Sequence, residues 1–152
     1  MCLCAIAKIL GQCQCVEPIE LIPIGTIDLH QISSILLDKL EEMGDIAADF
    51  NLADNVSRLY TEADVKKLLD LSEVDKIIFV AEDMDCDDFA GILYGEFCKQ
   101  RAFPGGIVDS HIHRLNWFVN ENLVLKFIEP QTKKISTNLE SWQGWDIKFF
   151  LS

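Results

Sequence analysis

The sequence predicts an α+β protein, in which helices come first and strands come last. Apolar residues recur at helical spacing in three segments before residue 100, and short β-rich runs fill the chain after residue 106. Helices and strands do not alternate along the chain, as they would around a parallel sheet. We therefore expect one domain over residues 1–152, in which a helical N-terminal half precedes a C-terminal antiparallel sheet. Residues 1–20 show little periodicity and predict an irregular, cysteine-rich lead.

The first predicted helix begins after Asp28. Gln31 stands three positions later, as in a capping box, in which two side chains satisfy the free N–H groups of a helix start. Apolar side chains then repeat at helical spacing, at Ile32, Ile35, Leu36, Leu40 and Met43. Gly44 is a typical helix stop, because glycine readily adopts the left-handed conformation found there.

The second predicted helix follows a stretch of turns over residues 45–60. Thr61 and Asp64 form another capping pair, and the helix continues through Val65, Leu68 and Leu69. The run Lys76–Ala81 is rich in β-formers, which predicts a strand or an extended approach to the acidic turn after it.

The third predicted helix begins at Asp85 and buries one face. That face carries Phe89, Ile92, Leu93 and Phe97. Pro104-Gly105-Gly106 ends the helical pattern, and the rest predicts strands. They cover residues 107–108, 113–119, 123–128 and 146–151, and the middle two form a hairpin around Asn120-Glu121-Asn122.

Composition and charge exclude some classes of function. The net charge is −12, so no basic stripe can displace counterions from nucleic acid, and neutral or basic partners are expected. No apolar stretch approaches the length of a membrane helix, and residues 1–10 make a poor signal peptide. We expect a soluble cytoplasmic protein, in the host cytoplasm if a phage encodes it.

Six cysteines are distributed unevenly. Cys2, Cys4, Cys13 and Cys15 form two Cys-x-Cys pairs, which could hold zinc through four thiolates. The usual zinc knuckle has two residues between its ligands, so we expect reduced thiols here rather than zinc. Cys98 lies too far along the third helix to pair with Cys86, and we expect it in the core. For Trp117, Trp142 and Trp145, the core is favoured over a substrate groove.

Cys86 is the most informative residue for function. It stands at a predicted helix start, where free N–H groups and the helix dipole lower the pKa of a thiol. His111, His113 and Glu129 follow it in the chain, and in the predicted hairpin His113 and Glu129 become cross-strand neighbours. A thiol, an imidazole and an acid are the groups that a cysteine nucleophile needs.

Four blocks of the sequence resemble the papain-like domain at the C-terminus of Marasmius-type fungal agglutinin, and similar phage and bacterial proteins. The resemblance covers about residues 55–151. The blocks are Cys86-Asp87-Asp88-Phe89-Ala90, Gly106-Ile107-Val108, His113-x-x-Asn116-Trp117-Phe118-Val119 and Phe127-Ile128-Glu129-Pro130-Gln131-Thr132. The resemblance implies a single papain-like domain, and a cysteine peptidase that acts on a peptide or protein substrate through an acyl-enzyme.

The same resemblance implies a role for each site residue. Cys86 is the expected nucleophile, His113 the general base and acid, and Glu129 the acid that orients the imidazole. Asn116 would support the site, and His111 is the second choice for the histidine. The chain departs from the pattern at Arg114, which follows His113, and at Val80, where papain-type enzymes keep a glutamine. The resemblance does not extend to the fungal protein's sugar-binding domain, so we expect no carbohydrate binding from it.

Two other functions stay open from the sequence. One is a catalytically inert binding or virion-associated protein with the same fold, and the other is a transglutaminase-like acyl transferase. The chemistry requires no cofactor, but the resembled domain is activated by metal. Calcium or manganese could bind the acidic residues around Cys86, which are Asp83, Asp85, Asp87 and Asp88. An EF-hand is excluded, because Asp88 occupies the glycine position and Tyr94 the position of the bidentate glutamate.

Overall fold

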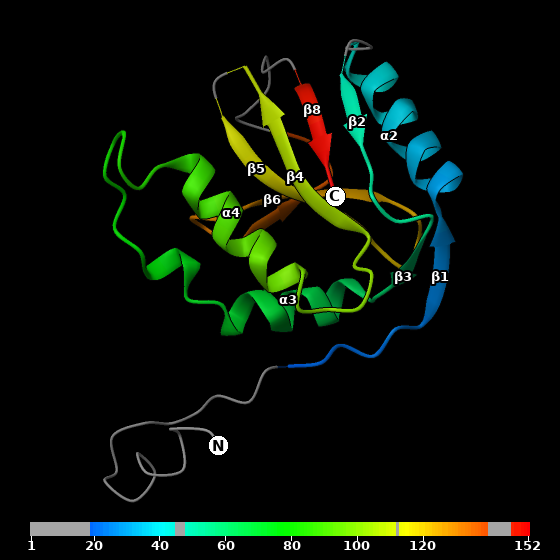
Figure 1. Ribbon diagram of the computed structural model, residues 1–152, viewed down its shortest axis with the longest axis horizontal. Helices are drawn as coiled ribbons and strands as arrows, with labels where there is room; N and C mark the ends of the chain where they lie inside the picture. Colours follow the sequence, from blue (N-terminus) through cyan, green and yellow to red (C-terminus); the bar gives the residue numbers. More distant parts are fainter. Residues whose placement is uncertain (1–18, 45–47, 112, 140–146) are drawn as a thin grey trace, which may run out of the picture.

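The computed structural model describes residues 19–44, 48–111, 113–139 and 147–152. Within these residues a six-stranded sheet carries helices on both of its faces, and a separate two-stranded sheet lies beside it (Figure 1). This arrangement is mixed α+β, which confirms the coarse fold class predicted from the sequence. The single-domain expectation stays a prediction.

The large sheet has the strand order β2-β8-β4-β5-β6-β7. These strands are β2 (Asp49–Asn51), β4 (Gly105–Ser110), β5 (Arg114–Val119), β6 (Leu125–Glu129), β7 (Lys134–Ser136) and β8 (Ile147–Leu151). All neighbours pair antiparallel except β2 and β8, which run parallel. The predicted C-terminal antiparallel sheet and its β5–β6 hairpin are therefore confirmed, with one parallel strand added at the edge.

Helix α2 (Leu29–Met43) covers one face of the sheet. Asp28 caps it by accepting a hydrogen bond from the Gln31 N–H at 2.8 Å, and the Gln31 side chain accepts one from the Asp28 N–H in return. Gly44 ends the helix with a φ of 75°, in the left-handed region. The helix buries Leu36 and Leu40 in a core that also contains Trp117 and Phe127.

Helices α3 (Glu62–Leu71) and α4 (Cys86–Phe97) lie over the opposite face. The Thr61 side chain caps α3 by accepting from the Asp64 N–H, as its spacing predicts. The second core contains Leu68 of α3, Leu93 and Phe97 of α4, and Phe118 of β5. Between the helices come η2 (Val74–Lys76), a single 3₁₀ turn, and an exposed loop.

Strand β5 shows why the sheet has two buried faces. Leu115, Trp117 and Val119 belong to the core beneath α2, whereas Phe118 belongs to the core beneath α3 and α4. Side chains alternate across a strand, so a strand covered on both sides reads as a continuous apolar run. Asn116 stands on the same side as Phe118, and its side chain reaches α4.

Two expectations about local structure were wrong, and of a third one alternative failed. The stretch 45–60 contains two strands rather than turns alone, since β2 pairs with β8 and β3 (Val56–Leu59) pairs with β1 (Gly25–Asp28). For the run 76–81, which was predicted as a strand or as an extended approach to the acidic turn, the strand does not form, and an isolated bridge joins Val80 to Met84. Cys98 is exposed rather than buried. Such short strands depend on partners distant in sequence, which local propensity does not reveal.

Trp117 is fully buried, which confirms its expected place in the core. Trp142 and Trp145 lie outside the described residues, as do Cys2, Cys4, Cys13 and Cys15, so the zinc expectation stays a prediction. None of the helices in the described parts of the chain combines the length and apolarity that a membrane crossing requires.

Candidate functional site

Cys86 is the first residue of α4, as expected, and its side chain is half-buried. The preceding residue, Asp85, is the N-cap and accepts a hydrogen bond from the Asp87 N–H at 3.3 Å. Asp88 completes a capping box by accepting from the Asp85 N–H at 3.2 Å. The acidic residues that precede and follow Cys86 therefore serve the helix start itself.

His113 and Glu129 meet, as the hairpin predicted. His113 stands just before β5 and Glu129 ends β6, and the His113 Nε2 and Glu129 Oε2 atoms are 2.8 Å apart. Both side chains are largely shielded, with 15% and 9% of their surfaces exposed. The other Glu129 oxygen accepts a hydrogen bond from the Gln131 N–H at 3.3 Å. This pair holds the imidazole in place at the end of the sheet.

Arg114 lies near the start of α4. Its guanidinium makes two hydrogen bonds with Asp109, its cross-strand partner on β4, and its Nη1 lies 3.9 Å from the Asp87 carboxylate. The Asp109 hydrogen bond raises the pKa of Arg114, and the Asp87 and Cys86 side chains raise it further. The Asp109–Arg114 pair depends on strand register, so the sequence interpretation missed it.

Asn116 is fully buried and joins α4 to the sheet. Its Nδ2 donates to the Ala90 carbonyl of α4 at 3.0 Å and to the Gly106 carbonyl of β4 at 3.2 Å. Its Oδ1 has no hydrogen-bond partner among the residues that the structure describes. His111, the second-choice histidine, is exposed in the turn between β4 and β5. The site roles expected of Asn116 and His111 stay predictions.

The acidic residues proposed for metal binding do not all converge. Potential ligand atoms of Asp85, Cys86 and Asp87 lie within 4.8 Å of one another, whereas Asp83 is exposed in the preceding turn. A hydrogen bond shared between Asp85 and Asp87 lowers the pKa of Asp85 and raises that of Asp87. Calcium or manganese activation stays a prediction.

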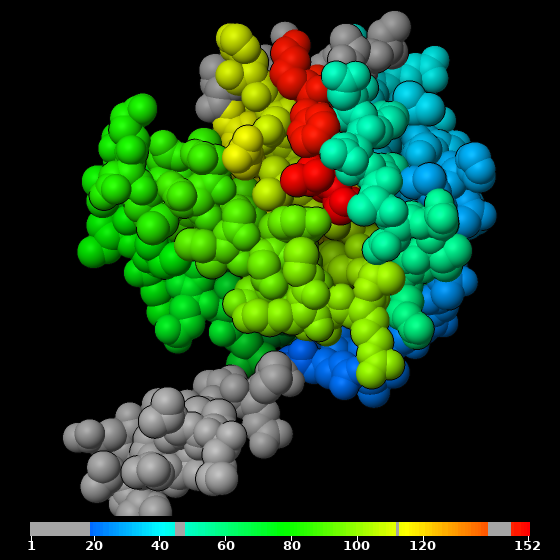
Figure 2. Space-filling model, viewed as in Figure 1, coloured from blue at the N-terminus to red at the C-terminus, as the bar shows by residue number. Residues whose placement is uncertain are grey.

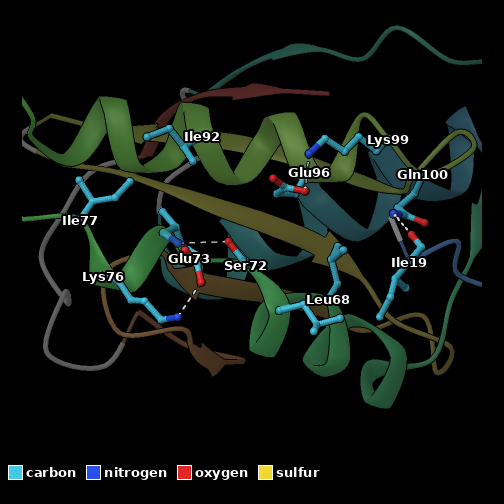
Figure 3. Close-up of a pocket in the computed structure, with 12 residues that line it drawn as sticks. Ile19, Leu68, Ser72, Glu73, Lys76, Ile77, Ile92, Glu96, Lys99 and Gln100 are labelled. Carbon is cyan, nitrogen blue, oxygen red and sulfur yellow. Dashed lines mark hydrogen bonds and ion pairs between the residues drawn. The ribbon is translucent and has the colours of Figure 1, made fainter. Parts of the chain in front are cut away.

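A groove lies between α3 with η2 on one side and α4 on the other, and it has a volume of about 540 Å³ (Figure 3). Half of its lining is aliphatic. These residues are Ile19, Leu68, Leu71, Val74, Ile77 and Ile92. Leu71 and Ile92 are 48% and 38% exposed, and Ile78 and Phe79, which follow in the chain, are also exposed. No aromatic side chain from the described parts of the chain lines this groove.

Polar side chains line the rest of the groove. They are Ser72, Glu73, Lys76, Glu96, Lys99 and Gln100. Lys76 pairs with Glu73 at 2.7 Å on one wall, and Lys99 pairs with Glu96 at 2.8 Å on the other. The charges of these four residues therefore balance one another. The groove accordingly offers an apolar floor between two neutralised polar walls.

Comparison with solved structures identifies proteins with the same fold. One is described as the PSL1a–E64 complex, with a TM-score of 0.68 and 22% identity over 84% of this chain and 51% of that chain. Another is Polyporus squamosus lectin bound to the human-type influenza-binding epitope Neu5Acα2-6Galβ1-4GlcNAc, with a TM-score of 0.61 and 22% identity over 78% and 48%. The chain thus spans about half the length of each protein. No protein-family profile and no curated protein matches it.

These matches correct the predicted function. The neighbours are fungal lectins of the agglutinin type, which agrees with the coarse part of the resemblance. The prediction of a cysteine-type hydrolase was wrong, because these structural neighbours are lectins. The individual roles of Cys86, His113 and Glu129 stay predictions.

The sequence interpretation missed the groove. One signal for it was present, because the run Ile77–Val80 is apolar and lies outside any helical or alternating pattern. That run was interpreted as a strand or as an extended approach to the acidic turn, and in the structure it is an exposed apolar loop beside the groove. Exposed apolar surface rimmed by polar residues is typical of an interaction site.

Proposed function

We propose that this protein is a binding module without hydrolytic activity, and that it holds an apolar segment of a protein partner in the groove between α3 and α4. The observation that carries the proposal is the groove itself, with its aliphatic floor and paired rim charges. A groove of several hundred cubic ångströms has the usual size of a ligand site. The agglutinin-type neighbours support binding as the class of function.

The lining favours a protein segment over a sugar. Proteins recognise small molecules and sugars through precisely placed polar groups, but the polar groups of this groove already have partners in the chain. Glu73 and Glu96 bond to lysines, and both ends of the Gln100 amide bond to backbone groups. Apolar side chains laid into a groove need no such groups, since their burial alone stabilises the complex.

The net charge of −12 adds a preference for a partner with basic flanks. The rim of the groove is neutral overall, so this preference comes from the field of the whole molecule. Such a field raises the association rate of an oppositely charged partner and weakens with added salt. We expect apolar segments flanked by lysine or arginine to bind best.

Carbohydrate binding is the second candidate, and the sialylated epitope held by the neighbouring lectin favours it. This chain spans only about half of that lectin, so the lectin's ligand cannot be assigned directly to this chain.

The papain-like fold predicted from the sequence also belongs to this proposal. The packing of α4 on β4 and β5 supports a papain-like arrangement of helix and sheet.

A peptide-display library panned against the wild-type protein tests the proposal. Peptides with apolar centres and basic flanks should be enriched, and they should fail to bind the Leu71→Glu variant. Leu37→Glu is the matched control, because Leu37 is 51% exposed on α2 and Leu71 is 48% exposed on α3. Each variant adds one negative charge, and circular dichroism checks that both are folded.

Two results would refute the groove as the binding site. One is enrichment that Leu71→Glu leaves intact, and the other is panning that enriches no sequence above background. A titration with the trisaccharide Neu5Acα2-6Galβ1-4GlcNAc runs in parallel. Binding of this glycan to wild type and Leu71→Glu alike would favour the second candidate at another surface.

A further inference from the structure

The walls of the groove limit the backbone conformation of a segment that binds there. Helices α3 and α4 form its two long walls, as Figure 3 shows. None of the described residues that line the groove belongs to a β-strand. These residues therefore offer no strand edge, whose open row of N–H and C=O groups is what an added strand pairs with.

The backbone groups of the helical walls are largely engaged within the chain. N–H and C=O groups inside a helix bond to one another. At the end of α3 the Ser72 carbonyl accepts a hydrogen bond from the Lys133 ammonium at 2.7 Å, and the Ser72 N–H donates to the Leu68 carbonyl at 3.0 Å. An extended segment in this groove would therefore bury its own N–H and C=O groups without partners, which costs free energy.

Two other common modes of peptide recognition do not fit the lining either. Polyproline segments bind grooves lined by aromatic side chains, and the described lining contains none. Acidic or phosphorylated motifs bind clusters of arginines, whereas the cations of this lining, Lys76 and Lys99, are already paired with Glu73 and Glu96. An amphipathic helix fits instead, because it satisfies its own backbone groups and presents only side chains to the groove.

We propose that the partner segment binds this groove as an amphipathic α-helix, with apolar residues at positions i, i+3 or i+4, and i+7. This inference rests on the binding function proposed above and specifies the partner. The α4 wall runs from Ile92 to Lys99, about 10 Å at the rise of a helix. Residues i to i+7 of a partner helix span the same length, so its apolar side chains lie against Leu68, Leu71 and Ile92.

The charges beside the groove favour basic residues on the polar face of that helix. Asp70 precedes Leu71 in α3, and Glu82 and Asp83 belong to the loop that leads from Ile77 to α4. All three carboxylates are exposed, and none forms an ion pair with another described residue. Residues 77–84 include no lysine or arginine. Lysines or arginines next to the apolar anchors of the partner therefore meet carboxylates that have no cation of their own.

Two peptide-display libraries test this inference. They share one composition, with lysines at both ends, and differ in the placement of their apolar residues. One library places them at i, i+3 or i+4, and i+7, and the other at every second position, which is the period of a strand. We expect the wild-type protein to enrich the helical library alone. Leu71→Glu should abolish that enrichment and Leu37→Glu should not, and Ile92→Glu is the second groove variant if Leu71→Glu proves unfolded.

The strongest binder then allows a direct test of its conformation. One derivative carries proline at a central position of its polar face, and the matched control carries alanine there. Proline breaks the helix and keeps every apolar anchor, so the affinity measured by isothermal titration should fall at least about tenfold. The alanine derivative should keep its affinity, and the circular dichroism of its complex should show more helix than the separate components.

Each failure has a different meaning. Enrichment from the alternating library alone, or a binder that tolerates proline, would overturn the helical partner and leave the proposed binding function standing. Helical peptides that bind Leu71→Glu as well as wild type would overturn both, because the groove would then not be their site. Enrichment from neither library would also end both proposals.

Discussion

Asn116 is the buried polar residue on which the contact between α4 and the sheet depends most directly. It lies in the second of the two cores and donates to carbonyls of two different elements. We expect Asn116→Ala to lower the free energy of unfolding by about 1–3 kcal/mol, because two buried hydrogen bonds are lost. Urea denaturation measures this change. The control is Asn122→Ala at an exposed position, whose free energy of unfolding should stay within about 0.5 kcal/mol of wild type. Equal losses in the two variants would show that the Asn116 side chain does not stabilise the contact between α4 and the sheet.

Alanine substitutions at two glycines should change the stability of the protein in opposite directions. A Cβ built on Gly106 would lie 1.8 Å from the Leu151 carbonyl oxygen, whereas one on Gly95 would meet no atom within 4 Å. Gly106→Ala should destabilise the protein by about 3 kcal/mol, because the paired strands β4 and β8 must separate. Gly95→Ala should stabilise it by about 0.5–1 kcal/mol, since alanine favours the interior of α4. Thermal unfolding of both variants checks this, and a stable Gly106→Ala would contradict the β4–β8 register.

Helix α3 is held to the hairpin by Glu62. Its carboxylate lies 2.9 Å from Lys66 on the same helix and 3.2 Å from Lys126 on β6. The Lys66 hydrogen bond, with help from Lys126, lowers the pKa of Glu62 below its usual value of 4.5. A lowered folded pKa gives stability that is present above pH 4.5 and is lost as the pH falls through the folded value.

The corresponding prediction concerns acid stability. Between pH 6 and pH 3 the wild type should lose more stability than Glu62→Gln, which cannot titrate at this position. Urea midpoints at several pH values measure the difference. Glu41→Gln, a change at an exposed carboxylate of α2, should follow the wild-type curve. A wild-type curve parallel to that of Glu62→Gln would show that the ion pairs of Glu62 do not stabilise the fold.

At the scale of elements, the sequence predicted the helices well and the short strands poorly. Helices α2, α3 and α4 begin beside caps at Asp28, Thr61 and Asp85, and these signals are local. Strands β1, β2 and β3 have three or four residues each, and their pairing partners lie far away in the chain. The hairpin of β5 and β6 was predictable, because its turn and both strands are contiguous.

The same distinction explains which parts of the site were predictable. The contact between His113 and Glu129 follows from hairpin register, so the sequence predicted it. The groove combines Ile19, residues 68–77 and residues 92–100, and its character depends on which apolar side chains stay exposed. Neither the convergence of those segments nor the exposure of Leu71 has a local signal. A function inferred from the residue order of a triad therefore took no account of the groove.

At the scale of the whole molecule, the side covered by α3 and α4 contains two separate regions. One is the groove, and the other is the start of α4 around Cys86. Figure 2 shows that the green segment, which includes these helices and the loop between them, forms a continuous part of the surface beside strands β4 and β8. Cys86 stands at the start of α4, whereas Glu96 and Lys99 mark the groove near its end. The binding proposal therefore predicts that the groove and the Cys86 region respond differently to substitution.

The affinity of one library-selected peptide, measured by isothermal titration for wild type, Leu71→Glu and Cys86→Ala, tests the binding proposal most directly. A glutamate in the groove should weaken binding at least about tenfold, because a charge must then lie against apolar side chains. Removal of the Cys86 thiol should leave the affinity within about twofold of wild type, a difference of less than about 0.5 kcal/mol. Binding that survives Leu71→Glu but is lost in Cys86→Ala would contradict the proposal and place the binding site at the start of α4.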